Sequence, residues 1–356
     1  MDIFSLLREA ASKGASDLHM VVSSPPLLRV NGLLEAVNGT KLLTANEINQ
    51  AFLQITTPEQ RESFHHHLEL DFNYSLSEVG QLRCNAAQQR GAISLAVRLL
   101  PAKVPTIDEL ELPAVYKELA TKQRGLLIVT GPTGSGKSTS QAAMIQHLNE
   151  SESRHVVTIE DPIEYVHPSI KCAITQRQLG SDTLSFAEAL RRVLRQDPDV
   201  ILVGEMRDLD TAAAVLSIAE TGHLILTTGH APSASQAVER VIDLFPPHER
   251  PLAQTRLASL LIAVLFQTLV PRIDGSGRIA ATEILLANSA ARNLIREGKT
   301  YQLPNVIRTS REIGMVSLDE ALVDLYLKRI ISYEAMLTFC WDRKEVEKLT
   351  GRAALK

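Results

Sequence analysis

The residues best suited to chemistry lie between Gly131 and Ser138. They read Gly-Pro-Thr-Gly-Ser-Gly-Lys-Ser, which fits the pattern G-x-x-x-x-G-K-[ST]. Glycines let the backbone curl so that successive N–H groups point at phosphate oxygens. The Lys137 ammonium can reach the β- and γ-phosphates, and the Ser138 hydroxyl can bind magnesium. The segment therefore predicts a nucleotide-binding site, with ATP and Mg²⁺ as its first candidates.

The flanking residues support this interpretation. A short apolar run, Leu126 to Val129, precedes the loop, and a stretch compatible with a helix follows it as far as Leu148. A helix that starts near Lys137 would direct the positive end of its dipole at the anion. The predicted nucleotide contacts are Gly131, Pro132, Thr133, Gly134, Ser135, Gly136, Lys137, Ser138 and Thr139.

Carboxylates follow two other apolar runs. Glu205 comes just after Val200 to Val203, whereas Asp199 begins that run and is expected at the opposite end of the strand. Nucleotide hydrolysis needs a magnesium shell and a group that activates water. Glu205 is therefore the candidate for the metal shell together with Ser138.

A second acidic segment follows the run Val156 to Ile159. It contains Glu160, Asp161 and Glu164, which a parallel sheet would present at its carboxyl edge, where ligands bind in open α/β sheets. Acidic residues after strands can also simply cap helices, and that alternative stays open for these residues.

Two histidines flank a third short run. His223 precedes Leu224 to Thr228 and His230 follows it closely. Both could sense the γ-phosphate or position water, although isolated histidines often have structural roles. The run His65 to His67 is different, because consecutive residues on a helix point in divergent directions, so no metal site is expected there.

Strands and helices are expected to alternate along the part of the chain that carries these residues. Short β-branched runs alternate with longer helical stretches after about residue 105, which indicates an α/β unit with a mostly parallel, buried sheet. The residues from Leu318 onward repeat apolar positions at helical spacing. The apolar run from Leu257 to Val270 is predicted to be a buried helix, since it is shorter than the ~20 residues needed to cross a bilayer.

The first hundred residues indicate a small mixed domain. A helix is expected up to Lys13, and Thr44 with Glu47 resembles a capping box. Asn31-Gly32 is a strong tight-turn signal. Strands are expected at Leu18–Val22, Leu27–Val30, Leu70–Tyr74, Gly80–Ala86 and Ala92–Leu99. The proline-flanked segment from Pro101 to Pro105 suggests a linker, so the predicted domains are 1–100 and 119–356, joined by 101–118.

The composition sets outer limits. The 356 residues are 45% hydrophobic and 22% charged with a net charge of −4, which excludes a wholly disordered, collagen-like or coiled-coil chain. Three scattered cysteines without a CxxC pair support neither a zinc site nor a disulfide framework, and favour a reducing, cytoplasmic setting. No targeting signal opens the chain, so membrane insertion is not expected.

Four motifs resemble those of secretion-superfamily ATPases. They are GPTGSGKST from Gly131, TIEDPIE from Thr158, DPDVILVGEMRD from Asp197 and AETGHL from Ala219. Further segments resemble the type IV pilus retraction ATPases of the PilT family. These are ASDLH from Ala15, ARNLIRE from Ala291 and the stretch from Gly314 to Asp319. The zinc motif of extension motors is absent from the sequence.

The resemblance implies a PAS-like α+β N-terminal domain, followed by a RecA-like P-loop ATPase domain with C-terminal helices. It also implies a homohexamer with ATP between the two domains. Glu164 would activate water, Glu205 would support magnesium partly through water, and His223 and His230 match the His box of the family. Arg83 and Arg98 are the candidates to complete the charge around the triphosphate, since Arg suits a phosphate fork.

The function implied by the resemblance is pilus retraction driven by ATP-dependent domain rotation. The expected partners are an inner-membrane platform protein and a second retraction ATPase, at the cytoplasmic face of the inner membrane at the pilus base. Two departures from the family stand out. Thr228-Gly229-His230-Ala231-Pro232 replaces the usual T-L-H-T, and Gln81 stands where the family often has arginine.

Three alternatives remain open at this stage. A PilU-like accessory retraction ATPase shares the same core motifs. A RecA-like nucleic-acid translocase would need a basic or aromatic-rich channel, and this acidic chain has only 1 Trp, 6 Tyr and 8 Phe, so no nucleic-acid partner is expected. A nucleotide-gated scaffold would bind ATP without hydrolysing it.

Overall fold

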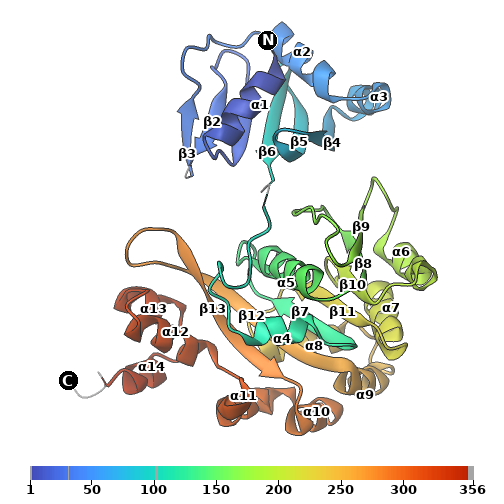
Figure 1. Cartoon of the computed structure of the whole chain (residues 1–356), viewed down its shortest axis with the longest axis vertical. Helices are drawn as coiled ribbons and strands as arrows, with labels where there is room; N and C mark the ends of the chain where they lie inside the picture. The colour runs from blue at the N-terminus through green and yellow to red at the C-terminus, as the bar shows by residue number, and fades with distance from the viewer. Residues whose placement is uncertain (1, 31, 101–102, 352–356) are drawn as a thin grey trace. The chain divides into compact units, whose positions relative to one another are not determined.

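The computed structural model describes residues 2–30, 32–100 and 103–351. Its internal contacts divide the chain into two units, coloured from blue to red along the sequence in Figure 1. The first unit comprises Met1–Lys103 and Glu164–Val166, and the second comprises Val104–Ile163 and His167–Lys356. Two residues of the predicted linker, Pro101 and Ala102, lie outside the described residues, as does Asn31 of the predicted turn.

The first unit combines an antiparallel sheet with three helices. The helices are α1 (Ile3–Ser12), α2 (Ala45–Ile55) and α3 (Pro58–His67), and the strands are β1 (Asp17–Met20), β2 (Leu27–Val30), β3 (Leu33–Ala36), β4 (Glu69–Leu76), β5 (Gly80–Gln89) and β6 (Ala92–Leu99). The sheet order is β3-β2-β1-β6-β5-β4. The expected capping box of Thr44 and Glu47 is confirmed at the start of α2, and Thr57 with Gln60 forms a second one at α3.

The second unit is built on a seven-stranded sheet in the order β13-β12-β7-β11-β10-β8-β9. All neighbouring strands are parallel except β12 and β13. The strands are β7 (Gly125–Thr130), β8 (His155–Glu160), β9 (Ala173–Gln178), β10 (Val200–Val203), β11 (Leu224–Gly229), β12 (Leu261–Pro271) and β13 (Arg278–Leu286).

Helices link these strands and extend to the C-terminal end of the described residues. The α-helices are α4 (Val115–Ala120), α5 (Lys137–Ser151), α6 (Phe186–Val193), α7 (Leu209–Glu220), α8 (Ala234–Asp243), α9 (Arg250–Leu260), α10 (Ser289–Arg296), α11 (Leu303–Thr309), α12 (Leu318–Leu327), α13 (Tyr333–Phe339) and α14 (Arg343–Leu349). Three short 3₁₀ helices are η1 (Leu194–Gln196), η2 (Thr300–Gln302) and η3 (Arg311–Ile313). The helix expected from Leu318 is confirmed as α12.

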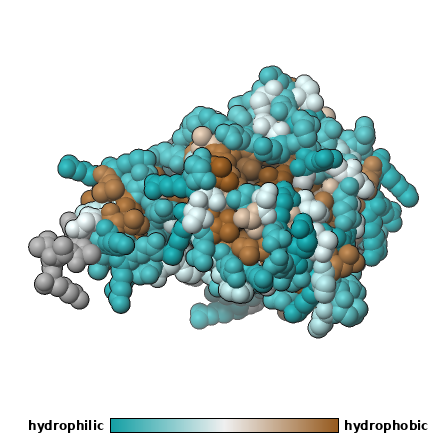
Figure 2. Space-filling model, turned by 90° about the horizontal axis from the view of Figure 1, so that it is seen from below, coloured by the Kyte–Doolittle hydropathy of each residue, from teal (hydrophilic) through white to brown (hydrophobic). Residues whose placement is uncertain are grey.

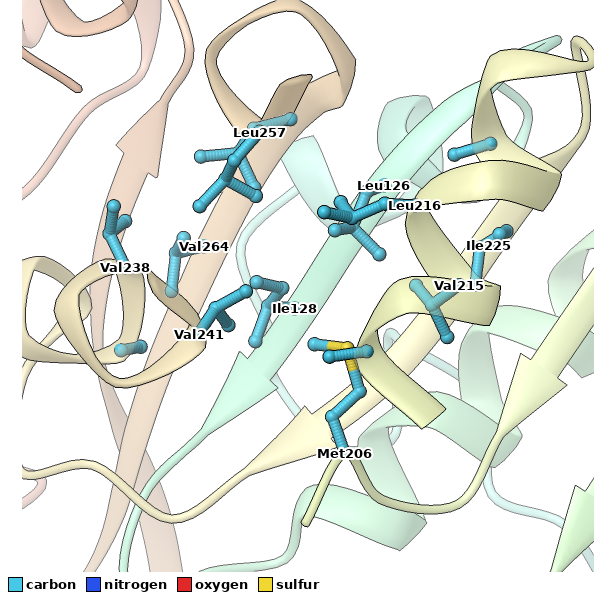
Figure 3. Close-up of a cluster of buried hydrophobic side chains, with 14 of the residues drawn as sticks. Leu126, Ile128, Met206, Val215, Leu216, Ile225, Val238, Val241, Leu257 and Val264 are labelled. Atoms are coloured by element: carbon cyan, nitrogen blue, oxygen red, sulfur yellow. The ribbon is translucent and has the colours of Figure 1, made fainter. Parts of the chain in front are cut away.

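Alternate strand residues of the second unit point to opposite faces of the sheet, and both faces are covered. Leu126 and Ile128 of β7 pack with helices α6 to α11, whereas Leu127 and Val129 pack with α4 and α5. Figure 3 shows the first cluster, in which β7, β11 and β12 meet helices α7, α8 and α9. Burial on both faces explains the nearly continuous apolar character of these strands.

The prediction of a buried helix from Leu257 to Val270 is wrong. Helix α9 ends at Leu260, and β12 begins at Leu261. Strand β12 lies between β7 and β13, and side chains pack on both of its faces, so every position along it is apolar or buried. A continuous apolar run of this kind does not distinguish a buried strand from a buried helix. Strand β12 brings Gln267 next to the loop that follows β7.

The described part of the predicted linker packs into the hydrophobic core of the second unit. Ile107, Leu112 and Tyr116 pack with β7 and α5, and each is buried. At the other end of the chain, helices α12 to α14 pack against β12 and β13. Hydrophobic residues form separate patches among hydrophilic ones on the face shown in Figure 2. No described helix has the length and apolar character needed to cross a membrane.

Candidate nucleotide site

The loop after β7 has the backbone of a phosphate cradle. Gly134 and Gly136 both have positive φ, at 75° and 85°. Residues with positive φ thus alternate with Ser135, whose φ is not positive, and this turns successive N–H groups toward the same concave side. Gly131 has a φ of 148°, and a Cβ there would lie 2.2 Å from the backbone oxygen of Gln267, so only glycine fits. The 15-residue helix α5 begins directly after the loop, which places its positive end at the cradle.

Lys137 supplies the positive charge of this cradle. Its side chain is buried, and Nζ donates to the carbonyl oxygens of Gly131 and Pro132, both at 3.0 Å. The ammonium is therefore held across the loop by backbone acceptors. Ser138 and Thr139 follow in the first turn of α5, where both are partly exposed.

The other predicted groups follow strands next to this one. The sheet order runs β7, β11, β10, β8. The loop of Lys137 follows β7, His230 follows β11, Glu205 follows β10, and Glu164 lies in the segment after β8. Since parallel strands end at the same edge, the segments that carry Lys137, His230 and Glu205 leave one edge of the sheet, the position at which α/β sheets bind ligands.

Glu205 and His230 are brought together at this edge. Glu205 has a side chain that is 18% exposed, and one of its oxygens lies 3.4 Å from His230 Nε2. The other oxygen accepts from Arg207 Nε at 2.7 Å. Arg240 donates to the backbone oxygen of His230 at 2.9 Å, which fixes the start of the following loop. The pairing of Glu205 and His230 gives a carboxylate–imidazole couple beside the phosphate loop.

Thr130 is a site-supporting residue that the sequence reasoning missed. Its hydroxyl accepts from the Ala231 amide at 2.9 Å and lies 3.3 Å from the Ala231 carbonyl oxygen. These contacts tie the end of β7 to the segment that carries His230. The departure at Ala231 and Pro232 therefore leaves this connection intact, because it uses only backbone groups of Ala231.

Gly229, the other departure, is not required by the backbone. A Cβ at this position would lie no closer than 3.6 Å to its nearest neighbour, Thr130 Oγ1, and φ is not positive. A small cavity of about 20 Å³ also lies beside this residue, lined in part by Ile128 and Val241. A side chain larger than hydrogen therefore fits here.

We accordingly expect Gly229→Ala to stabilise the protein. Alanine lowers the entropy of the unfolded chain where the native backbone tolerates it, which should raise the thermal midpoint by about 1–3 °C. Gly222→Ala is the matched control, since its φ of +97° is strained for alanine and the midpoint should fall. Thermal unfolding followed by circular dichroism measures both. A lower midpoint for Gly229→Ala would contradict the expectation.

His223 lies away from these groups. It precedes β11, and its carbonyl oxygen accepts from the amide of Gly125, the first residue of β7. Its ring contacts Thr221 Oγ1 at 2.8 Å. The six residues of β11 span roughly 20 Å at about 3.3 Å each, so His223 and His230 lie at opposite edges of the sheet. The role of His223 at a nucleotide therefore stays a prediction, and the structure pairs only His230 with Glu205 among the described residues.

Glu164 is exposed in the segment that follows β8. Ile163, the residue before Glu164, is anchored to strand β9, because its amide donates to Gln178 Oε1 at 3.2 Å. Glu160 instead accepts from Thr158 Oγ1 at 2.6 Å and is engaged within the sheet. Among these carboxylates, Glu164 is therefore more available to a substrate than Glu160. His167 further along is buried, and burial lowers its pKa to about 4, so it is neutral at pH 7.

Asp199 lies at the opposite edge, as expected. Its carboxylate accepts from the His155 amide at 2.8 Å, at the start of β8. In the described parts of the chain, no group of three or more His, Cys, Asp or Glu side chains could hold a metal ion, the run His65 to His67 included.

Arg83 and Arg98 belong to the first unit, where β5 and β6 place them directly opposite each other. Directly opposed residues of antiparallel strands share a face, and both arginines are exposed there. Arg98 Nε donates to Asp17 at 2.9 Å. Burial alone would raise the pKa of Asp17, but hydrogen bonds from Ser16 and Arg98 outweigh it and the pKa lies below its usual value. Arg98 is thus held in place by an ionised carboxylate.

An apolar cavity adjoins the phosphate loop within the second unit. It has a volume of about 560 Å³, and its walls come from the first half of the loop, the segment around His230, β12 and the C-terminal helices. Phe266 and Trp341 form part of its apolar wall, with ring centroids 6.1 Å apart. The C-terminal helices therefore reach the neighbourhood of the nucleotide site.

Comparison with known proteins decides the family. The family described as "Type II/IV secretion system protein" matches residues 2–314. The chain belongs to this family. It is 45% identical over 334 residues to the type IV pilus retraction ATPase PilT of Pseudomonas aeruginosa, which covers 94% of this chain and 96% of that protein. It is 41% identical to the type IV pilus ATPase PilU of the same organism, covering 95% of this chain and 88% of PilU.

A solved structure agrees with this assignment. The crystal structure of the pilus retraction motor PilT with bound ADP superposes with a TM-score of 0.92 at 38% identity, covering 98% of this chain and 99% of that one. The chain is a PilT-family ATPase with a RecA-like core, which confirms the predicted fold class and the predicted ATP-hydrolysing activity. A scaffold that never hydrolyses ATP is therefore not favoured.

Proposed function

We propose that this PilT-family ATPase is a hexameric motor that powers the retraction of a type IV pilus. The observation that carries the proposal is the 45% identity to PilT over almost the whole length of both proteins. The phosphate cradle, the Glu205–His230 couple and the exposed Glu164 supply the chemistry that such a motor needs. ATP and its hydrolysis products bind two conformations of the motor with different relative affinities. Hydrolysis therefore shifts the balance between the conformations, and this shift drives domain rotation.

The proposed roles follow from the placement of each group. Lys137 and the loop N–H groups bind the β- and γ-phosphates, and Glu164 accepts a proton from the attacking water. His230 would orient that water, and its contact with Glu205 at 3.4 Å supports this role. Ser138 and Glu205 would hold Mg²⁺, partly through water, and the ion would neutralise charge on the phosphates. Arg83 and Arg98 add positive charge around the triphosphate.

The proposed assembly is a ring of six copies in the cytoplasm, peripheral to the inner membrane at the pilus base. Its partners would be an inner-membrane platform protein and a second retraction ATPase. No nucleic-acid partner is proposed, since the chain is acidic overall and has few aromatic residues.

A PilU-like accessory role is the second candidate, favoured by the 41% identity to PilU. Deleting the gene and following fluorescently labelled pili in single cells tests both roles. Loss of retraction, restored by the wild-type gene, supports the main motor. Retraction that persists with only the other motor present supports the accessory role, and retraction unchanged in strains lacking either or both motors would contradict the proposed function.

A further inference from the structure

Gln267 contacts the phosphate loop from beneath. It lies on β12, which pairs in parallel with β7 and places Phe266 opposite Thr130, the last residue before the loop. Its side chain is buried, and Nε2 donates to the carbonyl oxygen of Ser135 at 2.7 Å. Because a carbonyl oxygen can only accept, the amide nitrogen must be the end that faces Ser135.

This hydrogen bond controls the direction of the next N–H group. In a planar trans peptide the C=O and the following N–H point in opposite directions. Holding the Ser135 oxygen toward β12 therefore turns the Gly136 N–H away from the sheet, toward the concave side of the loop. Gly136 is also the residue that precedes α5 and has a positive φ, so its peptide orientation is part of the cradle.

The loop rests on Gln267 at its other end as well. A Cβ at Gly131 would lie 2.2 Å from the Gln267 backbone oxygen, and one at Gly136 would lie 3.2 Å from its Nε2. One residue of β12 thus defines the surface against which both ends of the loop pack. Among the described residues, Gln267 Oε1 and Ser135 Oγ have no hydrogen-bond partner. The bond from Gln267 Nε2 to the Ser135 carbonyl oxygen is therefore the polar link between the two residues.

We propose that Gln267 is a positioning residue for nucleotide binding, which holds the Ser135–Gly136 peptide in the orientation that binds phosphate. It acts through the loop and does not itself touch the nucleotide. The inference rests on the proposed role of the loop as the ATP site. Since the β-phosphate is bound both before and during hydrolysis, loss of the bond should weaken binding uniformly, raising KM while kcat stays nearly constant.

The test compares Gln267→Met with wild type, using mant-labelled ADP with Mg²⁺ for binding and phosphate release for turnover. Methionine keeps the size but cannot donate, so we expect Kd and KM to rise roughly tenfold with kcat within about twofold. Thr282→Val is the matched control, because Thr282 lies opposite Gln267 on β13, is also buried, and is one strand farther from β7 and its loop. Its Kd and KM should match wild type.

Gln267→Leu provides a second variant. Its side chain can neither donate nor accept a hydrogen bond, so it should also weaken binding even if the methionine variant fails to fold, and thermal melting reports folding for each. Unchanged Kd and KM in folded Gln267 variants would overturn the proposal, as would an equal loss of affinity in Thr282→Val. Absence of mant-ADP binding by the wild type would overturn the proposed nucleotide site itself.

Discussion

Replacing Lys137 with alanine is expected to reduce ATP hydrolysis at least ~100-fold, because the variant loses the charge that stabilises the transferring phosphate. Lys137 is buried and its Nζ donates to the carbonyl oxygens of Gly131 and Pro132, so alanine also removes these two hydrogen bonds across the loop. The direct measurement is phosphate release by the purified protein. In cells, the same substitution should abolish pilus retraction.

Lys122→Ala is the matched control for this experiment. Lys122 is exposed, lies in the same unit and precedes β7, but it is not part of the site. Its turnover should equal that of the wild type. Thermal melting shows whether Lys137→Ala remains folded. Near-normal hydrolysis by a folded Lys137→Ala variant would refute the assignment of the loop as the catalytic nucleotide site.

The substitution Glu164→Gln is expected to lower turnover by roughly 100- to 10,000-fold, the range over which a general base contributes. Glutamine has the same shape but cannot accept the proton from water. Binding should persist, since the phosphate loop and Lys137 follow β7, whereas Glu164 comes after β8. The two measurements are phosphate release and the affinity for mant-labelled ATP.

Glu118→Gln makes the same chemical change on the exposed surface of α4 and should leave turnover unchanged. Asp161→Asn, in the same acidic segment as Glu164, shows whether the base is specific to one carboxylate. Wild-type turnover by Glu164→Gln would remove Glu164 as the base. A large loss in Asp161→Asn alone would transfer that role to Asp161.

Gly229 and Ala231 show how a departure in sequence can be neutral in structure. Both replace larger residues of the family pattern beside His230. The structure shows that the segment is held by Thr130 through backbone groups of Ala231 and by Arg240 through the backbone of His230. Side-chain identity at 229 and 231 therefore has little control over where His230 lies, and its contact with Glu205 is retained.

Local sequence patterns are enough to predict the phosphate loop and the helix caps of this chain. The loop from Gly131 to Ser138 is recognisable because all of its residues are consecutive in the sequence. Its glycines permit the backbone conformations on which phosphate binding depends. The capping box at Thr44 was also predictable, since its partners are three residues apart. Glu205 and Glu164 are predicted as site residues because each comes soon after an apolar run.

Which of these groups meet depends on the strand order of the folded chain. The strand order β7-β11-β10-β8 places His230 beside Glu205 and leaves His223 about a strand length away, although both histidines flank the same strand. Gln267 contacts Ser135 although 132 residues separate them in the sequence, and it lies on a strand where the apolar pattern predicts a helix. Short-range patterns encode conformation, whereas contacts between distant residues depend on how strands pair and which face each side chain takes.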